Sequence, residues 1–304
     1  MPFLFSDSST IGGCWKVKLL EEREATNDFG VFEILELRTE NVNFIFPGVE
    51  LLESDLQLIY GIGPATTIKL NKAGYHTIND LLEHPRWNRA AAEVLEIIKA
   101  KDYARLARYG ASDLQLLSFF KPEEIVFIDI ETTGLYYIHP VFLVGLLTFK
   151  DGQGQISQVL ARNPAEERAL LYETIGFLKQ AKIIVSFNGR SFDVPYLKGR
   201  MRFQGLNDEI NSFHFDLLRQ TRKQYRSQLP NCRLLTIERH LFNQERIDDL
   251  PGSQVGEYYY KYLETKDQGY LRPILEHNAC DLLTMAKLLG LITGQASEVS
   301  CNGN

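Results

Sequence analysis

The chain has 304 residues, of which 44% are hydrophobic and 24% charged, and its formal net charge at pH 7 is −6. This composition predicts a globular protein with a large core and more than one domain, and it excludes a uniformly basic nucleic-acid-binding protein. No hydrophobic run has the length of a transmembrane helix, the start lacks a signal peptide, and the scattered cysteines lack zinc-site spacing. We therefore expect a cytoplasmic protein without membrane contacts, and no feature indicates a protein partner.

Residues 1–52 are predicted to form short strands. Apolar and polar residues alternate at 14–19 and again at 31–37, and a polar turn separates the two stretches. Nothing in this segment carries chemistry, so we interpret it as a small β appendage.

Residues 53–118 are predicted to be helical, with continuous helix from about 87 to 118. Near the start, the turn at Gly61 and Gly63 separates two helical segments, and Pro64 opens the second. The arrangement resembles the helix-hairpin-helix motif, whose glycines allow backbone N–H groups to approach a nucleic-acid phosphate. A purely structural helix pair is the alternative.

The stretch Val126–Gly134 is predicted to be a buried strand that ends in a Thr-Thr-Gly turn. Asp129 and Glu131 are two residues apart, so both carboxylates point to one face of the strand. Two buried like charges are unfavourable without a counter-charge, and Mg²⁺ or Mn²⁺ would supply one. The alternative is a strand end whose acids are exposed to solvent.

From residue 123 to 294 the pattern predicts one α/β domain. Three strands joined by short turns are followed by a helix, a fourth strand at 183–187 and another helix. Residues 295–304 are predicted to be a disordered tail.

Two further acids could complete a site with Asp129 and Glu131. Asp193 opens the helix after the fourth strand, where it could also serve as a simple helix cap. His277 and Asp281 are four residues apart on the last helix and share one face, although an exposed ion pair would look the same.

These acids occur in the order found in the DEDD superfamily of 3′–5′ exonucleases, and residues 123–292 resemble the YprB family of ribonuclease H-like proteins. The resemblance rests on Phe127–Gly134, Phe187–Asp193, His214–Leu218, Leu234–Glu238, Asp249–Gly252 and His277–Asp281. It implies a mixed sheet flanked by helices and a pair of bound Mg²⁺ or Mn²⁺ ions. In the His subclass the histidine usually precedes the last Asp by five residues, whereas here the gap is four.

The resemblance also implies residue roles. Four carboxylates would bind the metal ions, His277 would be the general base, and three residues would hold the terminal nucleotide: Thr132, Thr133 and Asn188. The metal ligands would be Asp129, Glu131, Asp193 and Asp281.

The stretch 219–246 is rich in arginine, and Arg222, Lys223 and Arg226 with Tyr225 between them predict a nucleic-acid surface. A solvated helix face is the alternative. We therefore predict a metal-dependent nuclease, a 3′–5′ exonuclease acting on DNA or RNA. A non-catalytic nucleic-acid-binding module and a phosphodiesterase for small nucleotides are the competing hypotheses.

Overall fold

The computed structural model describes residues 9–13, 15–39, 44–150 and 152–301 of the chain. The chain divides into two compact units. The first comprises residues up to 44 together with 122–292, and the second comprises 45–121 together with the residues from 293 on. Across the described part of the chain, no helix combines the length and hydropathy that a membrane-spanning segment needs.

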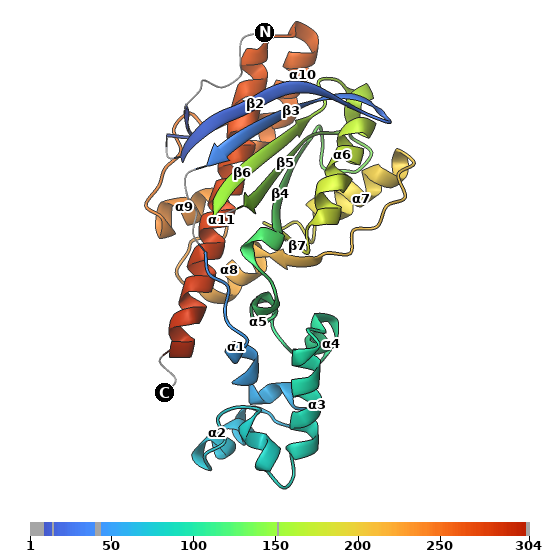
Figure 1. The fold of residues 1–304 in the computed structure, drawn as a ribbon. Coiled ribbons are helices and arrows are strands. Elements are labelled where there is room, and N and C mark those ends of the chain that lie inside the picture. The colour runs from blue at the N-terminus through green and yellow to red at the C-terminus, as the bar shows by residue number, and fades with distance from the viewer. Residues whose placement is uncertain (1–8, 14, 40–43, 151, 302–304) are drawn as a thin grey trace. The chain divides into compact units, whose positions relative to one another are not determined.

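The first unit is built on a mixed sheet whose described strands follow the order β1-β2-β3-β6-β5-β4-β7-β8 (Figure 1). β4 is parallel to β7 and β7 to β8, and the other neighbours are antiparallel. The strands are β1 Ser9–Ile11, β2 Trp15–Asn27, β3 Gly30–Thr39, β4 Ile125–Thr132, β5 Val141–Lys150, β6 Gln153–Leu160, β7 Ile183–Ser186 and β8 Phe213–Asp216.

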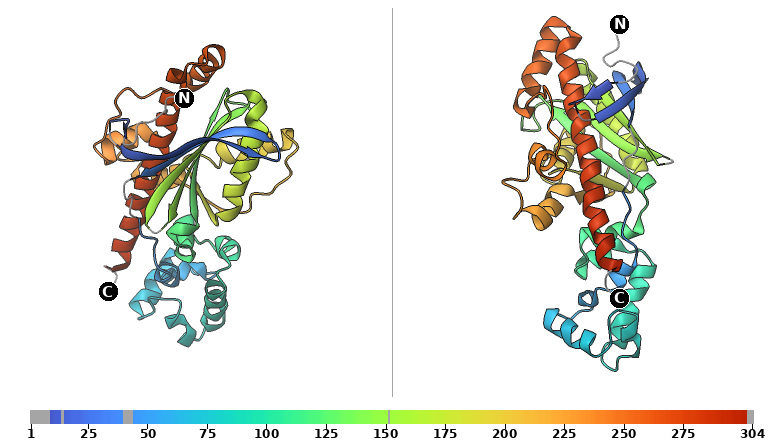
Figure 2. Two further views of the ribbon diagram at one scale, coloured as in Figure 1. Left: turned by 45° about the horizontal axis from the view of Figure 1, so that its top comes forward. Right: turned by 90° about the vertical axis from the view of Figure 1, so that its left-hand side faces the viewer.

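Helices cover both faces of this sheet. α6 packs across β2, β3, β5 and β6, and α11 lies on the opposite face (Figures 1 and 2). The helices after β6 are α6 Glu167–Gln180, α7 Asp193–Phe203, α8 Leu217–Tyr225, α9 Leu234–Leu241, α10 Val255–Thr265 and α11 Leu271–Cys301. Short 3₁₀ turns occur at Pro122–Glu124, Pro164–Glu166, Gly252–Gln254 and Gln268–Tyr270. The predicted ribonuclease H-like order of three strands, helix, strand and helix is confirmed.

The N-terminal strands are part of this sheet, so the prediction that residues 1–52 form a separate β appendage is wrong. β3 pairs antiparallel with β6, with Leu35 opposite Gln158, and Leu35 and Leu37 are fully buried. Alternation of apolar and polar residues shows which face of a strand is buried but does not identify its partner strand. Residues 1–8, 14 and 40–43 of this segment lie outside the described residues.

β4 lies inside the sheet between β5 and β7, which explains its long apolar run. Its residues from Ile125 to Ile128 are buried, and its side chains alternate between the two faces. Asp129 and Glu131 therefore share a face, and a bulge between Glu131 and Thr132 interrupts the regular pairing with β5. The two acids thus stand beyond the part of β4 that pairs with β7, on a segment that pairs with β5.

α11 continues to Cys301, so the prediction of disorder from residue 295 is wrong as far as that residue. The prediction ended the helix at Gly294. A single glycine costs a helix about 1 kcal/mol relative to alanine, which lowers its propensity without ending it. Residues 302–304 lie outside the described residues.

The second unit is helical in its described part, with α1 Glu50–Glu53, α2 Pro64–Lys72, α3 Asn88–Lys99, α4 Tyr103–Arg108 and α5 Asp113–Leu116. Turns of 3₁₀ helix occupy Leu56–Leu58, Asp80–Glu83 and Leu117–Phe119. The predicted continuous helix from 87 to 118 is wrong, because Lys101 (φ 53°) and Gly110 (φ 100°) take left-handed conformations that separate α3, α4 and α5.

Candidate active site

Two carboxylates project from β4 toward one side of the sheet. Burial raises the pKa of Asp129 well above its usual value, and the negative charges of Asp281, Glu131 and Asp193 raise it further. The pKa of Glu131 is also raised well above its usual value, by burial first and then by Asp281 and Asp193. Both carboxyl groups therefore resist ionisation in the metal-free protein.

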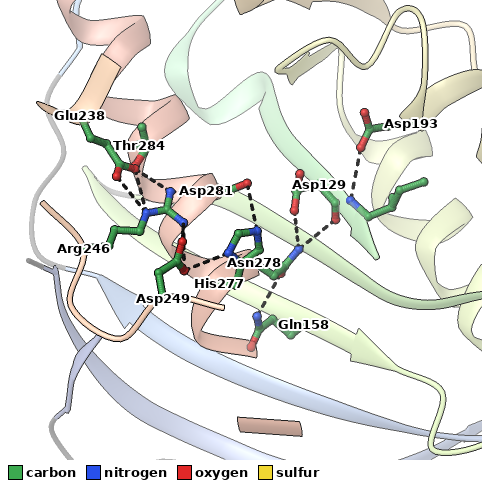
Figure 3. Close-up of polar contacts among 11 residues, drawn as sticks. Asp129, Gln158, Asp193, Glu238, Arg246, Asp249, His277, Asn278, Asp281 and Thr284 are labelled. Carbon is green, nitrogen blue, oxygen red and sulfur yellow. Dashed lines mark hydrogen bonds and ion pairs between the residues drawn. The ribbon is translucent and has the colours of Figure 1, made fainter. Parts of the chain in front are cut away.

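The third predicted acid, Asp193, is the first residue of α7 and faces β4 (Figure 3). Its Oδ1 accepts a hydrogen bond of 3.3 Å from the N–H of Ile130. Gly189 allows the tight turn between β7 and α7, because a Cβ there would collide with Ser186 Oγ and lie 3.1 Å from Asp193 Oδ2. Burial raises the pKa of Asp193 to about 7, although backbone hydrogen bonds oppose the shift.

His277 and Asp281 lie one turn apart on α11 (Figure 3). His277 Nδ1 is 2.9 Å from Asp249 Oδ1, and His277 Nε2 is 3.8 Å from Asp281 Oδ2. Because an ionised carboxylate only accepts hydrogen bonds, Nδ1 carries a proton and Nε2 is the nitrogen that can be unprotonated. Burial disfavours the charged imidazole, but the hydrogen bond to Asp249 and the charges of Asp281 and Asp249 outweigh it and raise the pKa of His277.

A buried arginine contacts Asp281 from the other side. Arg246 Nη2 lies 2.5 Å from both Asp281 Oδ1 and Glu238 Oε1, and Arg246 Nε lies 2.9 Å from Glu238 Oε2. The Arg246 side chain is 2% exposed and that of Glu238 is 3% exposed. The prediction that Arg246 belongs to a nucleic-acid surface is therefore wrong, because its guanidinium is buried.

Asn278 connects α11 to β4 and is fully buried. Its Nδ2 donates to Asp129 Oδ2 at 2.8 Å, and its Oδ1 accepts from Gln158 Nε2 at 3.0 Å (Figure 3). Gly145 pairs with Asp129 in the sheet, and a Cβ on Gly145 would collide with the Asn278 amide. The absence of a side chain at Gly145 thus lets α11 approach the sheet closely enough for Asn278 to reach Asp129.

The structure brings the predicted metal ligands into mutual electrostatic contact: Asp129, Glu131, Asp193 and Asp281. Within the described ranges, no three His, Cys, Asp or Glu side chains are already arranged to hold a metal ion. Several carboxylate oxygens instead accept hydrogen bonds from protein groups. The donor chemistry fits Mg²⁺ or Mn²⁺, since these cations prefer carboxylate oxygen and would offset the clustered negative charge.

Asn188, which was predicted to hold the terminal nucleotide, is exposed in the turn after β7 with a left-handed backbone (φ 68°). Asp216 fixes this turn: its Oδ1 accepts from the N–H groups of Asn188 (3.1 Å) and Leu218 (3.0 Å), and its Oδ2 accepts from the N–H of Arg190 (3.1 Å). Asp216 therefore has a structural role that presents the Asn188 side chain to solvent.

The other two predicted nucleotide-binding residues lie where β4 ends. The Thr132 hydroxyl donates to the Gly134 carbonyl at 2.8 Å, and Thr133 Oγ1 is buried without a hydrogen-bond partner in the part of the chain that the structure describes. Residues 135–138 (Leu-Tyr-Tyr-Ile) are exposed. The Tyr196 hydroxyl lies 2.7–3.0 Å from the carbonyl oxygens of Tyr136 in this loop and of Gly134 and His139 on either side of it. An apolar loop with an anchored backbone thus follows the β4 acids directly.

The basic residues predicted to contact nucleic acid lie at the end of α8 and directly after it. Arg222, Lys223 and Arg226 are exposed. Tyr225 between them is only 4% exposed, so it packs in the interior and cannot stack on a base. The basic residues remain candidates for nucleic-acid contact, and the aromatic one does not.

In the second unit, a glycine turn precedes α2 as predicted. Gly61 has φ 89°, and a Cβ there would lie 3.4 Å from the Trp87 ring. Gly63 is the N-cap of α2 in an extended conformation, and Pro64 is its first residue. A Cβ at Gly63 would meet no atom within 4 Å. Pro64 has no N–H, and the N–H groups of Thr66 and Thr67 both donate to the Gly63 carbonyl at 2.9 Å, so what the turn offers at the start of α2 is the open space beside Gly63.

A model of the ribonuclease H superfamily matches residues 126–293. Because the match covers more than half of the chain and the fold agrees with it, the chain belongs to the ribonuclease H superfamily. An uncharacterised protein named YprB from Bacillus subtilis (strain 168) is 28% identical to the chain over 177 residues. This aligned segment is 56% of the chain but 42% of YprB, and it confirms the predicted YprB-type resemblance.

A family B DNA polymerase from the hyperthermophilic archaeon Pyrobaculum calidifontis has a similar fold over 59% of this chain and 26% of the polymerase chain. The TM-score is 0.47 and the sequence identity is 18%.

Four residues of the site were missed by sequence reasoning, although each had a signal. Asp249 and Asn278 lie inside stretches that carried the family resemblance, at Asp249–Gly252 and His277–Asp281. Arg246 is an arginine shortly before acidic residues, and Gln158 directly precedes the apolar end of β6, where it is fully buried. Buried polar residues require partners. Asn278 and Arg246 contact the predicted acids, Asp249 contacts the predicted base, and Gln158 contacts Asn278.

Proposed function

We propose that the chain is a divalent-metal-dependent nuclease, a 3′–5′ exonuclease that hydrolyses phosphodiester bonds at the ends of DNA or RNA. The observation that carries this proposal is the gathering of Asp129, Glu131, Asp193 and Asp281 on one side of the sheet, where burial and mutual repulsion raise the pKa values of the first three. A protein without metal chemistry has no need of this unfavourable arrangement.

The four acids would hold Mg²⁺ or Mn²⁺. Two such cations supply the positive charge that activates a water molecule and stabilises the leaving oxygen of a phosphodiester. Asn278 keeps Asp129 in place through the 2.8 Å hydrogen bond to Oδ2, and the N–H of Ile130 keeps Asp193 in place. Asp129 and Glu131 stand on an inner strand, where their backbone pairs with β5, so their positions are fixed before substrate arrives.

His277 would take the proton of the attacking water at Nε2. Asp249 holds the ring through Nδ1 and thereby leaves Nε2 as the accepting atom. In the metal-free protein the pKa of His277 is raised, which favours the protonated ring that cannot accept a proton. The positive charge of bound cations would disfavour a positive charge on the His277 ring, so the neutral ring would be available to accept a proton.

Three surfaces of the first unit would contact the nucleic acid. Arg222, Lys223 and Arg226 would attract phosphates, and Asn188 would reach the terminal nucleotide from the turn after β7. The apolar loop at 135–138 offers exposed side chains on an anchored backbone, against which the last unpaired base could pack.

The second unit would bind nucleic acid without taking part in the chemistry. The glycines of the turn at Gly61 and Gly63 carry no side chains and would let a phosphate approach the start of α2, as in helix-hairpin-helix motifs. Tyr60, next to the turn, is 93% exposed.

A cleavage assay with the full chain tests this proposal. Single- and double-stranded DNA and RNA, labelled at either the 5′ or the 3′ end, are incubated with Mg²⁺, Mn²⁺ or EDTA, and the Asp193→Asn variant is the control. We expect a ladder of products shortened from the 3′ end that requires metal and disappears in the variant. Tight binding without cleavage would favour the non-catalytic module, and cleavage confined to dinucleotides would favour a small-nucleotide phosphodiesterase.

A further inference from the structure

Arg246 is the buried cation nearest to the acid cluster, and its function is not explained by nucleic-acid binding. It lies between α9 and α11, with its Nη2 bonded to Asp281 Oδ1 at 2.5 Å (Figure 3). At 2% exposure its side chain cannot meet a phosphate of the substrate. Its contacts therefore act inside the protein.

Glu238 is the counter-ion that makes this burial tolerable. It accepts from Arg246 through both oxygens and from the Thr284 hydroxyl on α11. A buried guanidinium is unfavourable unless carboxylates compensate it, and here Glu238 fixes the plane of the guanidinium while Nη2 also reaches Asp281. The direction of that second contact is thus determined before any cation binds.

The contact with Arg246 gives the two carboxylate oxygens of Asp281 different roles. Oδ1 is held by Arg246, whereas Oδ2 is 3.8 Å from His277 Nε2, beyond hydrogen-bonding distance. A carboxylate with one oxygen fixed by a buried donor cannot rotate freely, so its second oxygen points in one direction. Ligating carboxylates are commonly oriented by such outer hydrogen bonds.

We propose that Arg246, supported by Glu238, is a positioning residue that orients Asp281 so that Oδ2 is presented to the divalent cation. This inference rests on the proposed metal-dependent function. It assigns to the pair a role in metal affinity, whereas a merely structural pair joining α9 to α11 would contribute to folding stability alone.

The test measures Mn²⁺ affinity of the full chain by isothermal titration calorimetry, with no substrate present. Arg246→Lys keeps the charge but loses the fork that reaches Glu238 and Asp281 together. The double variant Arg246→Met with Glu238→Gln removes both charges of this ion pair, so the net charge is unchanged and Glu238 is not left as an unpaired carboxylate in the interior. Arg239→Met is the matched control, because Arg239 forms an exposed ion pair with Glu245 nearby.

We expect both Arg246 variants to bind Mn²⁺ about 10- to 100-fold more weakly, while Arg239→Met binds like the parent. The loss of cleavage should shrink as Mn²⁺ is raised, since a misoriented ligand lowers affinity more than it changes the chemical step. If Arg246→Lys does not fold, the Mn²⁺ affinity of the double variant tests the same inference.

A third variant, Asp129→Asn, separates failure of this inference from failure of the proposed function. Loss of Mn²⁺ binding in Asp129→Asn together with parental affinity in both Arg246 variants would overturn the positioning role and leave the metal site intact. Parental affinity in Asp129→Asn would overturn the metal site itself, and the role of Arg246 with it.

Discussion

The acid cluster has two sides that differ in how their charges are compensated. On the β4 and α7 side, Asp129 and Asp193 accept hydrogen bonds from neutral groups, the Asn278 amide and the Ile130 N–H. On the α11 side, Asp281 is bonded to the guanidinium of Arg246. One side is unfavourable until a cation arrives, and the other is already paired within the protein.

This difference indicates where a bound cation has its largest effect. Uncompensated buried carboxylates gain most from a positive charge, whereas a carboxylate that already contacts an arginine gains less. The β4 and α7 side should therefore set whether metal binds, and the α11 side should set how the reacting groups are oriented. The following predictions test that division, from the largest expected effect to the smallest.

Asp129→Asn and Asp193→Asn should each lower the cleavage rate by about 10³-fold or more, because a bound cation contributes several kcal/mol to the transition state. Each should also raise the melting temperature of the metal-free protein, since a repelling carboxylate is removed. Rates are compared in Mg²⁺ and melting temperatures in EDTA.

Asp281→Asn should have the opposite effect on stability: it should lower the melting temperature of the metal-free protein, because it weakens the contact with buried Arg246. Equal stability changes in the three variants would contradict the division.

His277→Ala should lower kcat by about 10²–10⁴-fold, the usual contribution of a general base. Mn²⁺ affinity should stay nearly unchanged, because the four carboxylates remain. Asp249→Asn should have a smaller effect in the same direction, since it loosens the ring without removing it. Steady-state rates at saturating metal check both. Full recovery of the His277→Ala rate at high Mn²⁺ would mean that the histidine supports metal binding instead of proton transfer.

The stability of the metal-free protein should fall as pH rises. The pKa of Asp193 is about 7 in the folded state against an ordinary value of 3.8, so its stabilising proton is present below the unfolded pKa and lost as pH rises through about 7. One such group gives a slope approaching about 1.4 kcal/mol per pH unit between those values. Denaturant unfolding in EDTA from pH 4.5 to 8 measures it. Asp193→Asn should flatten the slope, and an unchanged slope would count against this assignment.

A substitution at the glycine turn of the second unit should alter the affinity for nucleic acid and leave both sides of the acid cluster unaffected. Gly63→Asp would place a carboxylate at the N-cap of α2 without a steric clash, and Gly63→Asn is the neutral match. We expect the Asp variant to bind long substrates about fivefold to tenfold more weakly than the Asn variant, with equal kcat. Binding titrations at several salt concentrations check this. Identical affinities would remove the turn from the nucleic-acid surface.

Much of the site could be predicted because the chemistry needs particular side chains at particular points of the chain. The alternation around Asp129 and Glu131, the helix start at Asp193 and the four-residue gap from His277 to Asp281 all report local geometry. Sequence periodicity reflects local geometry, so it predicted both the type of each element and the face on which its functional side chains lie.

The partners of these residues could not be predicted, because they depend on contacts between distant segments. Arg246 and Tyr225 looked like parts of one basic, aromatic surface, yet both side chains are buried. The composition of the stretch 219–246 shows that it is basic. Because the helices there are short and strongly charged, composition does not show which side of each helix faces the core. The pairing of β3 with β6 was not predicted either, because it too joins segments that are far apart in the sequence.

The position of β3 has a consequence for how the chain is made. Its partner residues on β6 follow it by roughly 120 residues, with the whole of 45–121 between them. At about 5–20 residues per second, the ribosome needs roughly 6–24 s to extend the chain that far after β3 has been made. Until then β3 has an unpaired edge, which other chains could bind. We therefore expect nascent chains stalled before residue 150 to aggregate more readily than chains stalled after residue 160.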